Sequence, residues 1–510
     1  MVTEQFLMVF AIVAYLIMVV WVGLSFSKKN TNSDDFYLGG RKLGPFVTAM
    51  SAEASDMSSW LLMGLPGVAY LSGIADAGWT AIGLAIGTYL NWLIVAKRLR
   101  RYTVKTNSIT VPDFFSARYR DEKGILNAIA AVVIIIFFIP YTASGFAACG
   151  KLFHSLFGVN YVTAMIISAI VIVTYTTLGG FLAASTTDFI QSIIMSIALI
   201  VVLFFGISSA GGWGAVVENA QSLGGYLSMV QTYDATTGTA APYTGLTICS
   251  VLAWGLGYFG MPHILLRFMA IENEKKLTLS RRVACIWVVI SLVVGVLIGV
   301  VGLAASKAGA IETLEGSASE TVIVKIADLL SHNGVIPAII AGLILAGILA
   351  STMSTADSQL LAASSSVSHN IIKGVFKKEL NDKQSLVIAR VSVFVIAVIG
   401  IIIALDSDSN VFKIVSFAWA GFGAAFGPVM LLALFWKRSN KYGALFGMIA
   451  GGAMVFIWKY GVAKLGGAFA IYELLPAFIV ALIVNVVVSL LTAKPSEEIE
   501  QEFEEVKAGR

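Results

Sequence analysis

The chain has 510 residues, of which 58% are hydrophobic and only 13% are charged, and its formal net charge is +4. Its mean hydropathy is +0.86. A soluble protein would carry about a quarter charged residues and about half apolar ones. The composition therefore excludes a string of soluble domains and predicts one integral membrane domain with short loops.

Apolar stretches long enough to cross a bilayer recur along the whole chain. A spanning helix needs roughly 20 mostly apolar residues, because its backbone polar groups find no water in the lipid and must bond within the helix. The approximate bounds of thirteen predicted spans are 6–26, 46–73, 77–96, 125–149, 160–180, 188–208, 245–266, 283–306, 336–370, 387–405, 411–436, 441–460 and 472–493. We therefore predict an all-α polytopic membrane protein, with a ninth span that continues beyond the membrane.

The distribution of basic residues orients these spans. If the N-terminus lies outside, 28 of the 34 Lys and Arg residues fall on the inner side, including Lys28, Lys29 and those within 267–282. The six outer ones are Lys151, Lys307, Lys325, Lys413, Lys459 and Lys464. Because cytoplasmic loops are enriched in Lys and Arg, we expect a cell-membrane protein with its N-terminus outside. The acidic tail at 494–510 is expected to be a solvated cytoplasmic terminus.

Two predicted spans are poor helices at their centres. The second contains the polar run 51–59 (SAEASDMSS), and the seventh contains 254–262 (WGLGYFGMP) with three Gly and one Pro. Inside a helix, Gly costs about 1 kcal/mol and Pro about 3 kcal/mol relative to Ala. Both spans are therefore expected to unwind, which is tolerated only where the backbone faces protein or a water-filled cavity.

The two interrupted spans are five spans apart, so they cross the membrane in opposite directions. This spacing predicts an inverted repeat of five plus five helices, with spans two to six at 46–208 and spans seven to eleven at 245–436. Residues 1–45, an extracellular loop at 209–244 and two peripheral helices in 437–493 would lie outside the repeat. Broken helices at matching positions point to the binding site of a secondary transporter. The alternative is a pair of kinked helices with a structural role only.

Further polar groups lie inside the predicted spans. In the ninth span, a stripe at helical spacing is formed by Ser351, Ser354, Thr355 and Ser358. Such hydroxyls either coordinate a small hard cation or bond back to their own helix. Intramembrane carboxylates are costly and mark functional sites by default; they are Asp56, Asp188 and Asp357. Asp188 begins the sixth span, so it could instead cap a helix N-terminus.

Short motifs carry a resemblance to a known family. They are 36–41 (FYLGGR), 54–58 (ASDMS), 63–67 (MGLPG), 254–260 (WGLGYFG), 262–264 (PHI), 267–270 (RFMA) and 353–355 (MST). With these motifs the chain resembles the sodium/solute symporter family, and within it the bacterial proline symporters, from about residue 6 to 490. The resemblance implies a secondary active symporter, not an enzyme, that imports L-proline with Na+ as the coupling ion by alternating access.

The resemblance also implies where the ligands bind. The sodium ligands would be the carbonyls of Ala54, Met57 and Ser351 and the hydroxyls of Ser354 and Thr355, with Asp56 and Ser58 beside them. The solute site would contain Tyr141, Trp254, Tyr258 and Pro262, with Ser55 and Gly64 nearby. Arg41 would line the inner mouth as a gating residue. Aromatic faces suit proline, because a cation over a ring gains about 0.5–2 kcal/mol.

Asp357 departs from the proline symporters, in which this position can carry an uncharged residue. With Asp188 and Ser358 it resembles a second sodium site of some family members, which implies more than one sodium per solute. The expected partners are proline, sodium and the lipid bilayer, with no nucleic acid, no other metal and no organic cofactor. The alternative function is a sodium- or proton-coupled symporter of another small amino acid or organic solute. An ATP-driven pump is disfavoured, because the chain has no Gly-x-x-x-x-Gly-Lys-Ser/Thr loop.

Overall fold

A computed structural model describes residues 2–27, 33–376, 381–406 and 410–509 of the chain. Lys28 and Lys29, which were predicted on the inner side, lie outside the described residues. Within the described residues the structure is helical except for one antiparallel hairpin and the connecting segments.

The elements follow one another along the chain without a second domain of another class. Before the hairpin they are α1 (Val2–Ser27), α2 (Ser33–Leu38), η1 (Gly39–Arg41), α3 (Pro45–Asp56), η2 (Trp60–Gly64), α4 (Leu65–Ser72), α5 (Ile74–Leu90), η3 (Asn91–Val95), α6 (Ala96–Lys105), α7 (Val111–Arg118), α8 (Ile125–Phe157), α9 (Tyr161–Ser209) and α10 (Trp213–Ser222). The hairpin pairs β1 (Gln231–Asp234) with β2 (Thr239–Pro242). After it come α11 (Gly245–Leu252), η4 (Ala253–Gly260), α12 (Pro262–Ala270), η5 (Glu274–Lys276), α13 (Leu277–Lys307), η6 (Gly316–Thr321), α14 (Val322–Ser331), α15 (Val335–Ser365), η7 (Ser366–Val375), α16 (Asp382–Ile403), α17 (Val411–Phe435), α18 (Lys441–Tyr460), η8 (Val462–Leu465), η9 (Gly467–Phe469), α19 (Leu474–Leu491) and α20 (Glu497–Ala508).

Many of these helices are suited to cross a membrane. Among the described residues, ten are long and apolar enough, and the bent pair Gly245–Gly260 and Pro262–Ala270 adds an eleventh. The shorter apolar helices Trp60–Ser72 and Tyr161–Thr177 fall in the second and fifth predicted spans. The protein is therefore a multi-pass membrane protein of the predicted all-α class. The exact count of thirteen spans stays a prediction.

Both predicted interruptions are present. Helix α3 ends at Asp56, and Met57 leaves the helical region with a ψ of 68° before the π-helical turn η2. In the seventh span the chain tightens into a 3₁₀ helix at Ala253–Gly260 and bends by 46° before α12. Pro262 occupies the first turn of α12, where its missing N–H leaves no helical hydrogen bond unmade. The Gly and Pro residues thus break this span where the sequence predicts.

Glycines in η4 also allow close packing of the broken segment. A Cβ on Gly255 would lie 2.2 Å from the carbonyl O of Gly83 in α5, and one on Gly257 would lie 1.9 Å from Nε1 of Trp419 in α17. Only glycine permits this approach, because it carries no Cβ. The segment η4 is therefore held against two neighbouring helices.

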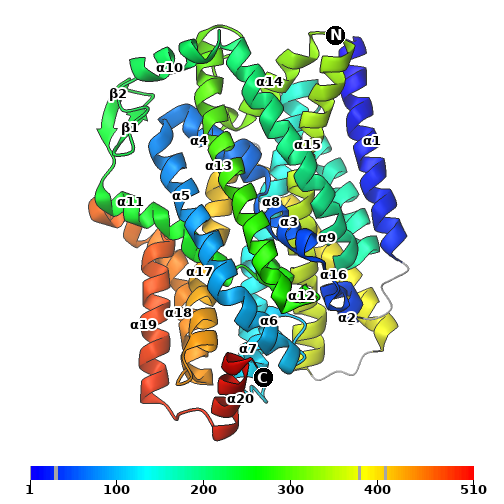
Figure 1. The fold of residues 1–510 in the computed structure, drawn as a ribbon, viewed down its shortest axis with the longest axis vertical. Coiled ribbons are helices and arrows are strands. Elements are labelled where there is room, and N and C mark those ends of the chain that lie inside the picture. The colour runs from blue at the N-terminus through cyan, green and yellow to red at the C-terminus, as the bar shows by residue number, and fades with distance from the viewer. Residues whose placement is uncertain (1, 28–32, 377–380, 407–409, 510) are drawn as a thin grey trace.

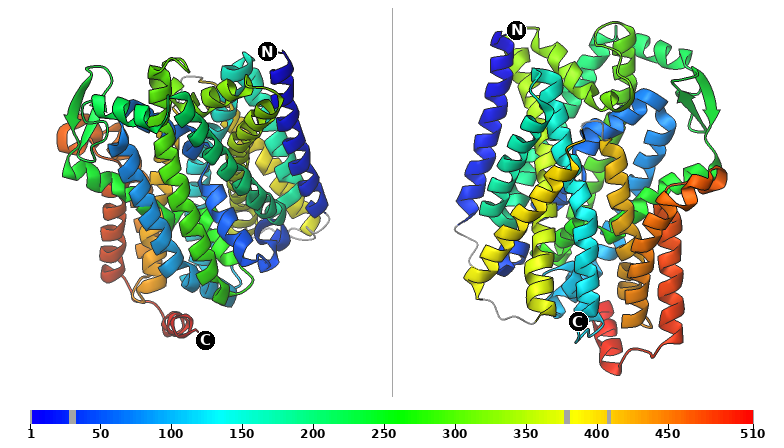
Figure 2. Two further views of the ribbon diagram at one scale, coloured as in Figure 1. Left: turned by 45° about the horizontal axis from the view of Figure 1, so that its top comes forward. Right: turned by 180° about the vertical axis from the view of Figure 1, so that it is seen from behind.

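Figure 1 shows the helices as an elongated bundle with the two termini at opposite ends of its long axis. Helix α1 lies at one edge of the bundle, and α19 lies at the opposite edge (Figures 1 and 2). Helices α3 and α12, which flank the two interruptions, pack against each other inside it. The residues of both helices are largely buried, so the polar breaks face protein rather than lipid.

The acidic tail is not the solvated terminus that the sequence suggested. It forms α20, which has a polar face and an apolar one. The buried residues of the apolar face are Ile499, Phe503 and Val506. On the polar face, Glu502 forms an ion pair with Arg120 at 2.6 Å. The spacing of the three apolar residues places them on one side of a helix, and α20 packs against α6.

Candidate functional site

The hydroxyl stripe of α15 meets the end of α3. Ser354 donates a hydrogen bond from Oγ to the carbonyl O of Ala54 at 2.7 Å. Ser354 and Thr355 also donate to the carbonyl O of Ser351, each at 3.1 Å. All four residues are buried, and Met57 follows at the end of α3. The structure thus joins four of the five predicted sodium ligands in one hydrogen-bonded cluster.

Asp56 links the two interrupted segments. The hydroxyl of Tyr258 in η4 donates to Oδ2 of Asp56 at 2.5 Å. The other oxygen, Oδ1, is buried and has no hydrogen-bond partner among the described residues. A buried carboxylate is costly without a counter-charge, so this oxygen is available to a cation. Ser58 lies in the following turn, where its Oγ accepts from the backbone N–H of Trp60 at 3.4 Å.

Aromatic side chains surround the same break. Trp254 and Tyr258 both contact Trp419, with ring centroids 6.2 and 5.0 Å apart. Trp254 also stacks on Tyr472 at a centroid distance of 5.2 Å. The hydroxyl of Tyr141 donates to the last carbonyl of α3 at 3.4 Å. Three predicted solute-binding residues, Tyr141, Trp254 and Tyr258, therefore come together around the end of α3.

The other predicted solute-binding residues lie around this group. Pro262 begins α12 directly after the bend. A Cβ on Gly64 would lie 3.2 Å from Cβ of Phe412, whose ring centroid is 5.3 Å from that of Trp254. Ser55 differs, because its hydroxyl donates to the carbonyl O of Ala52 at 2.9 Å in its own helix. Ser55 is thus positioned on the broken helix but turned toward its backbone.

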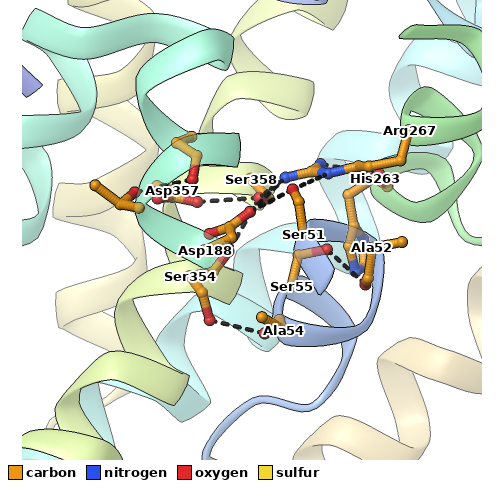
Figure 3. Close-up of polar contacts among 12 residues, drawn as sticks. Ser51, Ala52, Ala54, Ser55, Asp188, His263, Arg267, Ser354, Asp357 and Ser358 are labelled. Carbon is orange, nitrogen blue, oxygen red and sulfur yellow. Dashed lines mark hydrogen bonds and ion pairs between the residues drawn. The ribbon is translucent and has the colours of Figure 1, made fainter. Parts of the chain in front are cut away.

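The residues of the expected second sodium site form one chain of polar contacts, and an arginine lies within it (Figure 3). Asp188 accepts at Oδ2 from the hydroxyl of Ser51 at 2.6 Å and from Arg267 at 3.0 Å. Arg267 also donates to Ser358 at 2.6 Å, and Ser358 donates to Asp357 at 3.0 Å. The structure brings Asp188, Asp357 and Ser358 together, but a fixed positive charge already contacts Asp188.

Both charged partners in this cluster are buried within helices. Arg267, which the distribution of basic residues assigns to the inner side, lies in α12 and is only 1% exposed. Asp188 does not cap a helix, because α9 is capped by Asn160 and Asp188 lies well past the kink at Gly180 (φ 64°, ψ −166°). Buried charges need a partner of opposite sign, and these two provide it for each other.

Arg41 ties together three segments at the end of the bundle that carries the C-terminus. Its guanidinium donates to the carbonyl O of Met269 at 2.7 Å, of Thr103 at 2.9 Å and of Ser108 at 2.6 Å. Next to it, the backbone of Leu43 pairs with that of Ile271 in a parallel bridge. The first interrupted segment is therefore fastened to the end of α12 at this side.

The comparisons with known proteins agree with this architecture. The family model of the sodium:solute symporter family matches residues 36–451. The chain belongs to this family. Its members are transporters, not enzymes. The chain is 40% identical to the osmoregulated proline transporter OpuE of Bacillus subtilis (strain 168), over 95% of this chain and 94% of the relative. It is 41% identical to the sodium/proline symporter of Escherichia coli (strain K12), over 97% and 95%.

Solved structures of other transporters share the fold. A Na+-coupled sialic acid symporter in a substrate-bound outward-open state superposes with a TM-score of 0.78 at 18% identity, over 96% of this chain and 99% of that chain. Mhp1, a nucleobase-cation-symport-1 family transporter in a closed conformation, gives 0.57 at 13% identity, over 92% and 98%. Both superpositions extend over nearly the whole of this chain.

One cluster of this family member was not identified from the sequence. Glu320, in η6, forms an ion pair with Lys151 of α8 at 2.9 Å. Its two carboxylate oxygens also accept the backbone N–H groups of Val411 at 3.3 Å and Phe412 at 3.1 Å, at the start of α17. A carboxylate at a helix N-terminus is favoured by the helix dipole. We call this arrangement the η6 latch. The sequence predicts Lys151 on the outer side and indicates no partner for it.

Proposed function

We propose that the protein is a sodium-coupled symporter that imports L-proline across the cell membrane by alternating access. OpuE of Bacillus subtilis (strain 168), described above, and PutP of the same organism, which is 42% identical to this chain, are both named as proline transporters. The observation that carries the proposal is the hydrogen bond from Ser354 to the carbonyl O of Ala54. It sets hydroxyl and carbonyl oxygens against the broken helix, beside the aromatic group of η4.

The sodium site would be built from oxygen atoms that already lie together. Ser354 and Thr355 donate to the carbonyls of Ala54 and Ser351 in this structure. A cation between them would take the carbonyl lone pairs and the hydroxyl lone pairs in place of its water shell. The carbonyl of Met57 would complete the set, and the Asp56 carboxylate with Ser58 would add charge and support beside it.

Proline would bind against the aromatic residues around the end of α3. The faces of Trp254 and Tyr258, with Tyr141, would pack the apolar ring and attract the secondary ammonium. The first amides of α12, after Pro262, are suited to a carboxylate, because a helix N-terminus presents free N–H groups and positive dipole. The hydroxyl of Tyr258 on Asp56 connects this site to the sodium site. Ser55 and Gly64 would shape the surrounding wall.

Two fastenings would act as alternate gates. Arg41 holds the end of α12 on one side of the site, and the η6 latch, through Glu320, holds η6 against α17 on the other. Opening one side requires the hydrogen bonds of Arg41 to break, and opening the other requires the contacts of Glu320 to break. With the N-terminus outside, the η6 latch would be the outer gate and Arg41 would belong to the inner one.

A second sodium at Asp188, Asp357 and Ser358 would raise the charge moved per proline above one. It would have to share Asp188 and Ser358 with Arg267. Counting the charges moved per proline in reconstituted vesicles tests this part of the proposal. A ratio of one contradicts it.

Labelled-proline uptake into proteoliposomes tests the function as a whole. We expect uptake to need an inward sodium gradient, to stop when choline replaces sodium, and to be lost in Asp56→Asn. Uptake that persists in choline would favour a proton-coupled symporter. If the vesicles accumulate another labelled small amino acid, and excess unlabelled proline does not reduce that uptake, the substrate is not proline.

A further inference from the structure

A cavity of about 530 Å³ lies apart from the site described above, beneath the β-hairpin. Its walls come from the end of α4, the end of α13, the hairpin and the loop that leads into η6. Residues that line it include Tyr70, Tyr233, Leu303, Lys307 and Glu315. Small-molecule sites commonly enclose about 300–1,000 Å³, so this hairpin cavity is large enough for a ligand.

Hydrogen bonds hold the walls of the hairpin cavity in place. Tyr70 donates to Oγ of Ser306 at 2.8 Å and accepts the backbone N–H of Leu314 at 3.0 Å, which joins α4, α13 and the loop. The segment that leads into the hairpin is fastened by Tyr226, which donates to the carbonyl O of Ala69 at 2.7 Å. Binding to a preformed cavity is favoured, because no free energy is spent on ordering its walls.

The lining combines an apolar interior with two opposite charges. Lys307 and Glu315 are exposed, and neither forms an ion pair with another residue in the part of the chain that the structure describes. The nearby Glu312 differs, because it pairs with Lys325 at 2.8 Å. The rings of Tyr70 and Tyr233 supply aromatic faces. A small molecule with a carboxylate, an ammonium and an apolar body matches all of these features.

We propose that the hairpin cavity binds a zwitterionic amino acid with an apolar side chain, at a second site outside the aromatic group of Trp254 and Tyr258. The carboxylate would face Lys307 and the ammonium would face Glu315, while the apolar body lies between Tyr70 and Tyr233. This inference rests on the proposed function, because it takes the transported solute as the ligand.

The hairpin cavity is connected directly to the η6 latch. Glu315 immediately precedes η6, the helix that carries Glu320. Helix α4 packs tightly on this segment, since a Cβ on Gly67 would lie 3.0 Å from the backbone N of Glu320. A ligand that bridges Lys307 and Glu315 holds η6 against α13 and binds the closed latch more tightly than the open one. Binding in the cavity therefore favours closure of the latch.

Equilibrium binding of labelled L-proline to the purified full chain in saturating sodium tests the inference. We expect two molecules of proline per chain in the wild type. Trp254→Ala and Lys307→Glu should each leave one, by loss of different sites. The matched control Lys464→Glu, a charge reversal at an exposed lysine of η8, should leave two. The exchange of Lys307→Glu with Glu315→Lys should restore the second molecule, because it restores both charges.

Two results overturn the inference. One is a single bound proline in the wild type that is lost in Trp254→Ala, and the other is two bound prolines in Lys307→Glu. Either would leave the proposed function intact if sodium still drives proline uptake. A wild-type chain that binds no proline at all would contradict both the proposed function and the second site.

Discussion

Replacing Glu320 with Gln tests whether the η6 latch closes the solute site. The Lys151–Glu320 pair spans 2.9 Å, and its side chains are only 9% and 2% exposed. Glu320→Gln removes the carboxylate from beside a buried ammonium, which costs about 3–5 kcal/mol while the latch is closed. With the latch open, both groups meet water and the cost is small. Since about 1.4 kcal/mol corresponds to a factor of ten, the ratio of closed to open latch should fall roughly a hundredfold or more.

Turnover of sodium-driven proline uptake should therefore fall steeply, while sodium-dependent proline binding to the purified protein persists. Both are measured with the same labelled proline, in proteoliposomes and in detergent. The matched control is Glu320→Gln combined with Lys151→Met, which removes both charges. Because replacing a whole buried pair is often nearly neutral, the double variant should regain much of the turnover. If the single and double variants lose turnover equally, the ion-pair reasoning is wrong.

Three further substitutions test other parts of the structure. Ser354→Ala removes a hydroxyl from the proposed sodium site. The sodium concentration for half-maximal uptake should rise about tenfold, which corresponds to a loss of about 1.4 kcal/mol of binding free energy. An unchanged sodium dependence argues against that site. Gly257→Ala places a Cβ 1.9 Å from Nε1 of Trp419. This should destabilise the fold by about 1–3 kcal/mol and lower the Tm of the purified protein. An unaltered Tm would show that η4 can move aside. Phe503→Ala empties a buried position of α20 and should speed amide hydrogen exchange in that helix alone, whereas exchange at the wild-type rate would mean that Phe503 does not hold the helix in place.

The sequence by itself determined the features that depend on local composition. Apolar stretches of spanning length specify an all-α membrane protein, because lipid offers no partner for the backbone. Gly and Pro break the seventh span at 253–261 in the structure, since they disfavour helix wherever they occur. The polar run in the second span predicts the break at Met57. The hydroxyl stripe follows from helical periodicity alone, whereas its contact with Ala54 was implied only by the resemblance to the family.

Tertiary structure decided which distant charges meet. Arg267 and Asp188 are 79 positions apart in the chain, and Lys151 and Glu320 are 169 apart. The sequence places Arg267 directly after the seventh predicted span, and only the packing of the helices shows that it is buried against Asp188. The apolar face of α20 was likewise read as part of a charged tail, because its docking surface comes from α6, far earlier in the chain. Periodicity records what each segment needs to bury, whereas the partner that satisfies a buried charge depends on how the helices pack.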